Sequence, residues 1–529
     1  MSVLSKKAST PIAVAAVFIA IVGATYLVRG RVYYPHIVVD AQQQVRFEFL
    51  QQGLLKDEDC QATVATVAQA IRVSCPTCRI ALQECSVGPV PDYEALLSEM
   101  PIAMPSSRLP RGVVTYLSDD GALALAACRE AERLSSSNPK SSTVCYPPNA
   151  QRTMLGSTAS RIDAHQALLG FLILLFTGAV SAFISYLIVR YERMHARWSH
   201  DPAGTGPQKF HATPTPRIGG LGVMASLFVC GAVLLATEQS APGEQFGYLL
   251  LASLPAFLGG ITEDVTKAVS VAARLMLTMA AAAIGVMLLG AVIPRLDVPG
   301  FDALLHLSPF AIAFTAFAVG GVANSINIID GYNGLAAGHA VIVLAAMAWL
   351  SALLGDQFLL ISALAMIGAL LGFLAWNYPK GRIFLGDGGA YLLGFWLGEL
   401  SVLIVMRHPE VSPWFPMLLL VYPIFETIFS MFRRKFIHRQ STGQPDRRHL
   451  HQLIYAQFAR THPGVSDRAA LTRMNSRVAP FGWLMTLGCA VPALLFWQET
   501  QWLVTVSLLY CLVYAVLYLR LSLSGSHAV

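Results

Sequence analysis

Twelve apolar segments, most of them long enough to cross a lipid bilayer, recur along this chain of 529 residues. A membrane-spanning helix needs about 20 predominantly apolar residues, and inside the bilayer it must satisfy its backbone hydrogen bonds internally. The segments run roughly over 11–29, 166–190, 218–237, 246–262, 271–293, 309–326, 335–354, 358–376, 390–406, 413–431, 480–498 and 502–520. The segment 246–262 is short for a span and is interrupted by Pro255. We therefore expect an all-α polytopic membrane protein with about twelve transmembrane helices.

The composition agrees with this fold class. Only 13% of the residues are charged and 55% are hydrophobic. A soluble globular domain usually carries about 25% charged residues. We expect the lipid bilayer to be the environment of this chain and nucleic acid not to be a partner.

The basic residues of the loops predict the orientation. Lys and Arg are concentrated in the loop after the second segment and in the loop 432–478, whereas the loops 238–245, 355–357 and 499–501 contain none. Short loops rich in Lys and Arg stay in the cytoplasm. With twelve spans, all the basic loops and both termini fall on the cytoplasmic side.

This orientation divides the chain into three parts. Residues 1–29 are expected to form a retained membrane anchor, and a cleaved signal peptide is the alternative. Residues 30–165 form a large segment outside the cytoplasm, and residues 166–520 form the membrane-embedded core.

Six of the nine cysteines lie in the segment 30–165, at Cys60, Cys75, Cys78, Cys85, Cys128 and Cys145. An even number of cysteines in an oxidising compartment predicts disulfides, with the pairing left open. Cys75 and Cys78 are three residues apart, so a redox or metal-binding pair is the alternative for them.

Five polar clusters interrupt the apolar chain, and all of them fall on the predicted cytoplasmic side. They are Pro214–Gly220, Glu263–Lys267, Asn324–Gly338, Asn377–Gly389 and Asp446–His451. Acidic residues at membrane depth are costly and are usually functional. The common side of the five clusters therefore indicates one shared site.

The residue types in these clusters favour phosphate chemistry. Asp264, Asp330 and Asp387 are hard oxygen donors of the kind that Mg²⁺ prefers. Positive charge for phosphate oxygens is available from Lys267, Arg447, Arg448, His449 and His451. The glycine-rich run Gly386–Gly389 is expected to leave backbone N–H groups exposed to an anion at a helix start. No P-loop motif is present, so we expect phosphoryl transfer from a donor other than ATP in a Walker fold.

The order of these motifs resembles that of the polyprenyl-phosphate N-acetylhexosamine-1-phosphate transferases. The matching motifs are PTPRIGG, ED-x-x-K, N-x-x-N-x-x-DG-x-NG-L-A-x-G, N-x₆-F-x-GD-x-G and DRRHLH, and they cover about residues 166–520. The resemblance implies transfer of an N-acetylhexosamine 1-phosphate from a UDP-sugar to undecaprenyl phosphate, with release of UMP, to start a cell-surface glycan. It also implies Mg²⁺, with Mn²⁺ as the alternative metal, and a multi-pass protein of the bacterial inner membrane with a cytoplasmic active site. A homodimer is left open.

The resemblance also implies roles for individual residues. Asp264, Asp330 and His449 are expected to be catalytic, with Asp264 orienting or deprotonating the lipid phosphate. Asp387 and Asn327 are the expected metal ligands. The expected substrate-binding residues are Glu263, Lys267, Asn324, Asn333, Asn377, Phe384, Arg447 and His451, with Asn333, Asn377 and Phe384 in the uridine pocket.

Three positions depart from the family pattern. Glu263 stands where the family usually has the first aspartate of a pair, Asn333 where it often has an aspartate, and Gln452 where it often has a third histidine. These departures leave the sugar open. The phospho-MurNAc-pentapeptide translocase, with the same chemistry, is the alternative. A transporter is the alternative from another class, although its site would lie near the bilayer midplane.

Overall fold

The computed structural model describes residues 33–41, 45–51, 57–75, 78–87, 106–109, 112–117, 124–129, 145–146, 164–201, 214–236, 240–437, 439, 446, 448–461 and 467–523. These residues fall into two compact units, one within 28–161 and the other within 162–529. The predicted anchor 1–29 and the predicted substrate-binding residue Arg447 lie outside the described residues.

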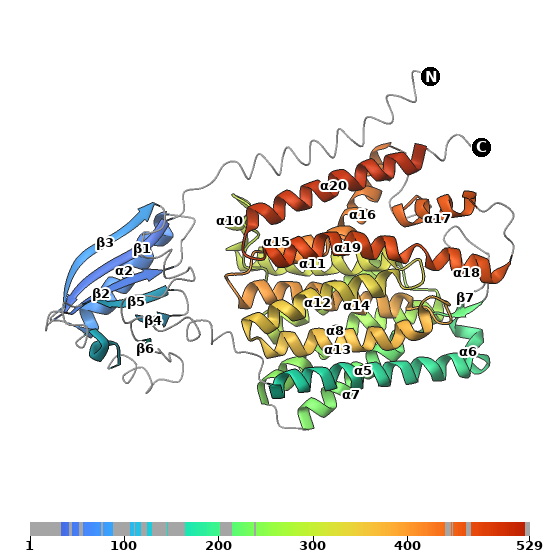
Figure 1. Cartoon of the computed structure of the whole chain (residues 1–529), viewed down its shortest axis with the longest axis horizontal. Helices are drawn as coiled ribbons and strands as arrows, with labels where there is room; N and C mark the ends of the chain where they lie inside the picture. The colour runs from blue at the N-terminus through green and yellow to red at the C-terminus, as the bar shows by residue number, and fades with distance from the viewer. Residues whose placement is uncertain are drawn as a thin grey trace, which may run out of the picture. The chain divides into compact units, whose positions relative to one another are not determined.

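The larger unit is a bundle of helices whose long members run side by side (Figure 1). Its helices are α5 (Ala164–Arg190), α6 (Glu192–Ser199), α7 (Gly220–Ala236), α8 (Ser240–Thr266), α9 (Val271–Leu289), α10 (Phe301–Leu305), α11 (Ser308–Ile329), α12 (Leu335–Leu354), α13 (Gln357–Asn377), α14 (Gly386–Arg407), α15 (Trp414–Leu419), α16 (Val421–Phe432), α17 (Leu450–Thr461), α18 (Arg468–Ser476), α19 (Ala479–Leu495) and α20 (Thr500–Leu523), with a π-helical turn η1 (Arg433–Ile437) after α16. A two-stranded pairing of β7 (His200–Asp201) with β8 (Thr215–Pro216) lies before α7.

Within the described residues, nine helices are long and apolar enough to cross a membrane, and α7 is apolar but shorter. The expected interruption at Pro255 does not occur, because α8 continues through this proline for 27 residues. The prediction of one helix over 413–431 is wrong. Helix α15 ends at Leu419 and α16 begins at Val421. Pro423 lacks an N–H group and its ring clashes with the carbonyl four residues before it, which accounts for a break there.

Helix α14 lies at the centre of this bundle, since 89% of the residues in its most apolar 18-residue stretch are buried. It packs against α7, α8, α9 and α11. The neighbouring helices approach its first turn closely at two glycines. A Cβ atom added to Gly260 would lie only 2.4 Å from the carbonyl oxygen of Asp387. A Cβ atom added to Gly220 would lie 2.4 Å from the backbone nitrogen of Gly389. Small residues of this kind let membrane helices come into backbone contact.

The smaller unit contains a six-stranded antiparallel sheet, so the prediction of an all-α protein is wrong for this part. The strands are β1 (Tyr33–Ala41), β2 (Val45–Gln51), β3 (Arg79–Val87), β4 (Ser106–Leu109), β5 (Gly112–Leu117) and β6 (Cys145–Tyr146), in the order β3-β1-β2-β5-β4-β6. Helix α2 (Asp57–Ser74) packs on β1 and β3. Val45, Phe47 and Phe49 alternate with polar residues in β2, which is the period of a strand with one buried face.

The predicted disulfides are present in this unit. Cys60 in α2 is bonded to Cys85 in β3, and Cys75 is bonded to Cys78 at the turn between the two elements. Cys128 is disulfide-bonded as well. Crosslinks that close loops restrict the unfolded chain, and they suit a small unit with a limited core.

Candidate active site

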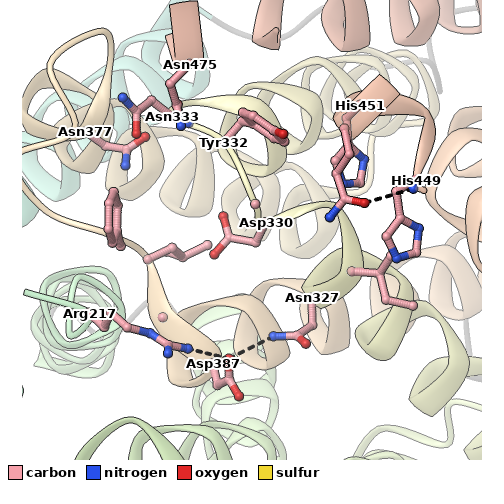
Figure 2. A pocket seen from close by; sticks show the side chains of 16 residues that line it. Arg217, Asn327, Asp330, Tyr332, Asn333, Asn377, Asp387, His449, His451 and Asn475 are labelled. Atoms are coloured by element: carbon pink, nitrogen blue, oxygen red, sulfur yellow. Dashed lines mark hydrogen bonds and ion pairs between the residues drawn. The ribbon is translucent and has the colours of Figure 1, made fainter. Parts of the chain in front are cut away.

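Polar residues from distant parts of the chain line one cavity of about 280 Å³ in the helical unit (Figure 2). Its described lining consists of Arg217, Asn327, Ile328, Asp330, Gly331, Tyr332, Asn333, Asn377, Phe384, Leu385, Gly386, Asp387, His449, His451, Gln452 and Asn475. Four of the five polar clusters therefore contribute directly to this cavity. The fifth, at the end of α8, lies behind the first turn of α14.

Asp387 is the most highly connected acid of the cavity. It lies in the first turn of α14 and its side chain is ion-paired with Arg217 at 3.2 Å and with Arg274 of α9. The Asn327 Nδ2 atom donates a hydrogen bond to Asp387 Oδ1 at 3.1 Å. Figure 2 shows Arg217 and Asn327 approaching this carboxylate from opposite sides. The predicted metal ligands, Asp387 and Asn327, are thus in direct contact.

Asp264 holds the start of α14. Its side chain is fully buried, and its two oxygens accept hydrogen bonds from the backbone N–H groups of Asp387, at 3.0 Å, and Gly388, at 2.8 Å. Arg217 Nη2 lies 3.5 Å from Asp264 Oδ1. The expectation that these N–H groups are open to an anion is wrong, because the Asp264 carboxylate is the anion that occupies them. Both oxygens of Asp264 thus contact the start of α14, and its predicted role toward the lipid phosphate stays a prediction.

Glu263 and Lys267 form the turn that ends α8. Glu263 Oε2 accepts a hydrogen bond from the Val269 N–H group at 2.7 Å, and Lys267 Nζ donates to the Asp264 carbonyl oxygen at 2.7 Å. Lys267 has a left-handed backbone with φ of 56°. Both residues lie outside the described lining of the cavity, so their predicted contacts with substrate stay predictions.

Asp330 follows the last residue of α11 and lines the cavity. In Figure 2 it lies between Asp387 and Tyr332. Burial raises the pKa of its carboxyl group well above the ordinary value, while the charge of Arg217 lowers it and that of Asp264 raises it. Asn324, two turns before Asp330, is half-buried and lies outside the described lining.

Asn377, the last residue of α13, connects the loop after α11 to the loop after α13. Its Oδ1 atom accepts a hydrogen bond from the Gly334 N–H group at 2.6 Å, and its Nδ2 atom donates to the Ile383 carbonyl oxygen at 2.7 Å. Gly334 has φ of 77°, a conformation that favours glycine. Both ends of the Asn377 amide are thus engaged with the backbone, which supports a positioning role in the predicted uridine pocket.

Asn333 and Phe384 lie beside Asn377 in the cavity lining. The Asn333 N–H group donates to Asn475 Oδ1 at 2.9 Å, and its Nδ2 atom donates to the Pro379 carbonyl oxygen at 3.2 Å. Phe384 is held through its backbone, which bonds to Pro216 at 2.8 Å and Gly219 at 2.9 Å. Its half-buried ring is an aromatic surface suited to stacking on a base.

The histidines lie across the cavity from this pocket. The rings of His449 and His451 are stacked, with centroids 5.3 Å apart. His449 Nδ1 lies 2.9 Å from Glu426 Oε1. Burial lowers the pKa of the His451 imidazole to about 3, with Glu426 raising it and His449 lowering it. His451 is therefore neutral at pH 7, and it can contact a phosphate as a hydrogen-bond donor but not as the cation that its sequence context suggested.

The sequence interpretation did not name four residues of the site. Arg217 and Asn475 line the cavity, and Arg274 and Glu426 contact the lining residues Asp387 and His449. Arg274 and Glu426 lie within apolar segments, where a charged residue is a sign of function, and this signal could have identified them. Arg217 is part of the PTPRIGG motif. Asn475 has no comparable signal, because it is an ordinary polar residue of a basic loop.

The oxygen donors of the cavity fit a magnesium ion. The Asp387 and Asp330 carboxylates and the Asn327 amide line the same space. Mg²⁺ typically binds through one or two carboxylates, with waters and substrate phosphates completing its octahedron. In the described part of the chain, no three His, Cys, Asp or Glu side chains gather as a metal cluster. The predicted Mg²⁺ site at Asp387 and Asn327 therefore stays a prediction.

Residues 246–405 match the model of the family described as glycosyl transferase family 4. The chain is 32% identical over 261 residues to a probable undecaprenyl-phosphate N-acetylglucosaminyl 1-phosphate transferase of Bacillus subtilis, a match that covers 48% of this chain and 69% of the relative. It is 28% identical over 317 residues to the decaprenyl-phosphate N-acetylglucosaminephosphotransferase of Mycobacterium tuberculosis, covering 53% and 75%. It is also 28% identical over 216 residues to a phospho-N-acetylmuramoyl-pentapeptide-transferase of Oceanobacillus iheyensis, covering 38% and 65%.

Proposed function

Since this chain belongs to glycosyl transferase family 4, we propose that it transfers an N-acetylhexosamine 1-phosphate from a UDP-sugar to undecaprenyl phosphate and releases UMP. The observation that carries the proposal is the cavity lined by Asp387, Asp330, Arg217 and two histidines, with Arg274 ion-paired to Asp387. The apolar helices suit a lipid acceptor, and the names of the relatives support a polyprenyl phosphate. We place the cavity on the cytoplasmic side of a bacterial inner membrane, where the basic loops are expected.

In the proposed reaction, an oxygen of the lipid phosphate attacks the β-phosphorus of the UDP-sugar. The new O–P bond joins the two phosphates on the lipid, and the bond between the β-phosphorus and the oxygen of the α-phosphate breaks to release UMP. Arg217 and Arg274 place positive charge at Asp387, where they offset the negative charge of the UDP-sugar diphosphate. A Mg²⁺ ion at Asp387 and Asn327 would supply further charge neutralisation to the diphosphate.

The remaining side chains would orient the two substrates. Asp330 faces the cavity with a raised pKa, so its carboxyl group can take up or release a proton at the lipid phosphate. Phe384 would stack on the uracil ring, while Asn377 and Asn333 hold the loops that carry the pocket. Asp264 keeps Asp387 in place through the first turn of α14.

The test of this proposal is nucleotide release by the purified protein with undecaprenyl phosphate and a panel of UDP-sugars. We expect UMP release from a UDP-N-acetylhexosamine and dependence on the lipid phosphate. Turnover of UDP-MurNAc-pentapeptide alone would identify the pentapeptide translocase instead. Nucleotide release that is independent of the lipid phosphate would reject transfer to a polyprenyl acceptor.

The smaller unit is expected to be dispensable for the chemistry. Replacing residues 33–146 with a flexible linker should keep UMP release measurable, because every described residue of the cavity lining belongs to the helical unit. The measurement is the rate per folded protein, with the melting temperature of the helical unit as the control. Loss of activity with an unchanged melting temperature would assign the smaller unit to the catalytic machinery.

A further inference from the structure

Glu426 is a buried acid that connects the histidine segment, which carries His449 and His451, to the helix bundle. It lies in α16 and is 1% exposed. Its carboxylate has three hydrogen-bonding neighbours: His449 Nδ1 at 2.9 Å from Oε1, and the Leu450 N–H group at 3.2 Å and the Tyr514 hydroxyl at 2.6 Å from Oε2. A buried carboxylate is tolerated when donors satisfy it in this way. Glu426 therefore has the partners that an ionised group needs.

Tyr514 brings the last helix, α20, into this network. It is fully buried and its hydroxyl donates to Glu426. Its ring is enclosed by aromatic neighbours, with centroid distances of 5.1 Å to Phe425 and 5.5 Å to Phe429. Such packing limits movement of the ring, so the hydroxyl is held at one position relative to Glu426.

The consequence falls on His449, which lines the cavity. The Glu426 carboxylate can only accept a hydrogen bond, so the proton of a neutral His449 belongs on Nδ1 and its Nε2 atom is left as the acceptor. The backbone N–H group of His449 also donates to Gln452 Oε1 at 3.0 Å, which fixes the backbone at this residue. A carboxylate that sets the tautomer and the direction of a histidine is a recurring catalytic arrangement.

We propose that Tyr514 and Glu426 are positioning residues that set the tautomer and orientation of His449 for the transfer reaction. This inference rests on the proposed function. All three residues follow the stretch 246–405 that matches the family model, so α16, the histidine segment and α20 together complete the site. The other groups that face His449 are the stacked His451 ring and Asp446, whose Oδ2 atom lies 3.9 Å from His449 Nε2 and is paired with Arg433.

The same helix offers a matched control for Tyr514. Tyr510 lies one turn earlier in α20, and its buried hydroxyl has no hydrogen-bond partner among the described residues. Tyr510→Phe and Tyr514→Phe each remove one buried hydroxyl from the same helix. Only the second removes a contact with Glu426, so their difference separates positioning of His449 from packing of α20.

The experiment compares the steady-state kinetics of UMP release for the full chain and its variants. We expect Tyr514→Phe to lower kcat about tenfold with little change in KM, since it removes a hydrogen bond to a charged group. Glu426→Gln should lower kcat further, because its neutral amide holds the His449 Nδ1–H group less strongly. Tyr510→Phe should leave both constants unchanged. Equal kinetics for Tyr510→Phe and Tyr514→Phe would overturn the proposal.

A second readout does not depend on turnover. Diethyl pyrocarbonate modifies imidazole nitrogens, and mass spectrometry of the His449 peptide gives the rate. We expect modification of His449 to be about fivefold faster in Tyr514→Phe, since Glu426 loses the hydrogen bond that fixes it beside His449, and unchanged in Tyr510→Phe. If the wild type releases no UMP but the modification rates differ, the proposed function fails while the positioning of His449 stands. Equal modification rates would overturn the positioning itself.

Discussion

Asp387→Asn should lower UMP release by about 10²–10³-fold or more, the range seen when a preorganised electrostatic contact in an active site is removed. The variant keeps the shape of the side chain but loses the charge that pairs with Arg217 and Arg274 and that would bind a metal. The bonds from Asp264 to α14 involve backbone N–H groups, so the helix start should remain intact. The measurement is kcat per folded protein at saturating Mg²⁺ together with the melting temperature, which should fall because the two arginines lose their carboxylate partner.

Asp302→Asn is the control for the loss of a carboxylate. Asp302 precedes the start of α11, whereas the cavity residue Asp330 follows the other end of this helix. The Oδ1 atom of Asp302 accepts a hydrogen bond from the Leu296 N–H group, and an asparagine oxygen can accept the same bond. Its activity should match that of the wild type. Wild-type protein treated with EDTA should stop releasing UMP and recover with Mg²⁺. Full activity of Asp387→Asn would remove the metal assignment.

Asp264→Asn should reduce both stability and activity. Both carboxylate oxygens accept backbone N–H groups at the start of α14, and an asparagine offers only one acceptor while its NH₂ group faces the second N–H. Leaving a buried donor unsatisfied costs about 1–3 kcal/mol, so the melting temperature should fall. Because the first turn of α14 carries Asp387, we expect UMP release to fall about 100-fold, as misplacement of a catalytic group by an ångström can do.

Glu263→Gln is the matched control, since it removes the neighbouring charge while its amide oxygen can still accept the hydrogen bond from Val269. It should leave the melting temperature unchanged. If Asp264→Asn lost activity at an unchanged melting temperature, Asp264 would act on the substrate directly, as the family resemblance suggested.

The hydropathy of the chain predicted most of the helical unit, because a spanning helix must be long and apolar. It could not predict the break between Leu419 and Val421, where the composition stays apolar and only the position of Pro423 matters. The sheet of the smaller unit was also missed. Only part of the strand sequences alternates between apolar and polar residues, so the cysteines were the stronger signal there.

The acids of the cavity were identifiable because Asp330 and Asp387 are polar exceptions beside apolar helices. Their individual roles could not be identified, because these depend on which atoms are in contact in the folded protein. Sequence alone does not reveal that Asp264 is occupied by two backbone N–H groups, or that both ends of the Asn377 amide are engaged. Likewise, Tyr514 reaches Glu426 across 88 residues of chain.

The central claim is that a sugar 1-phosphate, rather than the sugar alone, moves to the lipid. It is tested most directly with UDP-N-acetylglucosamine labelled with ³²P at the β-phosphorus, incubated with the purified protein and undecaprenyl phosphate. The account predicts that the label enters the lipid fraction and that the released nucleotide is unlabelled UMP. Label that leaves in UDP, with an unlabelled glycolipid, would contradict it.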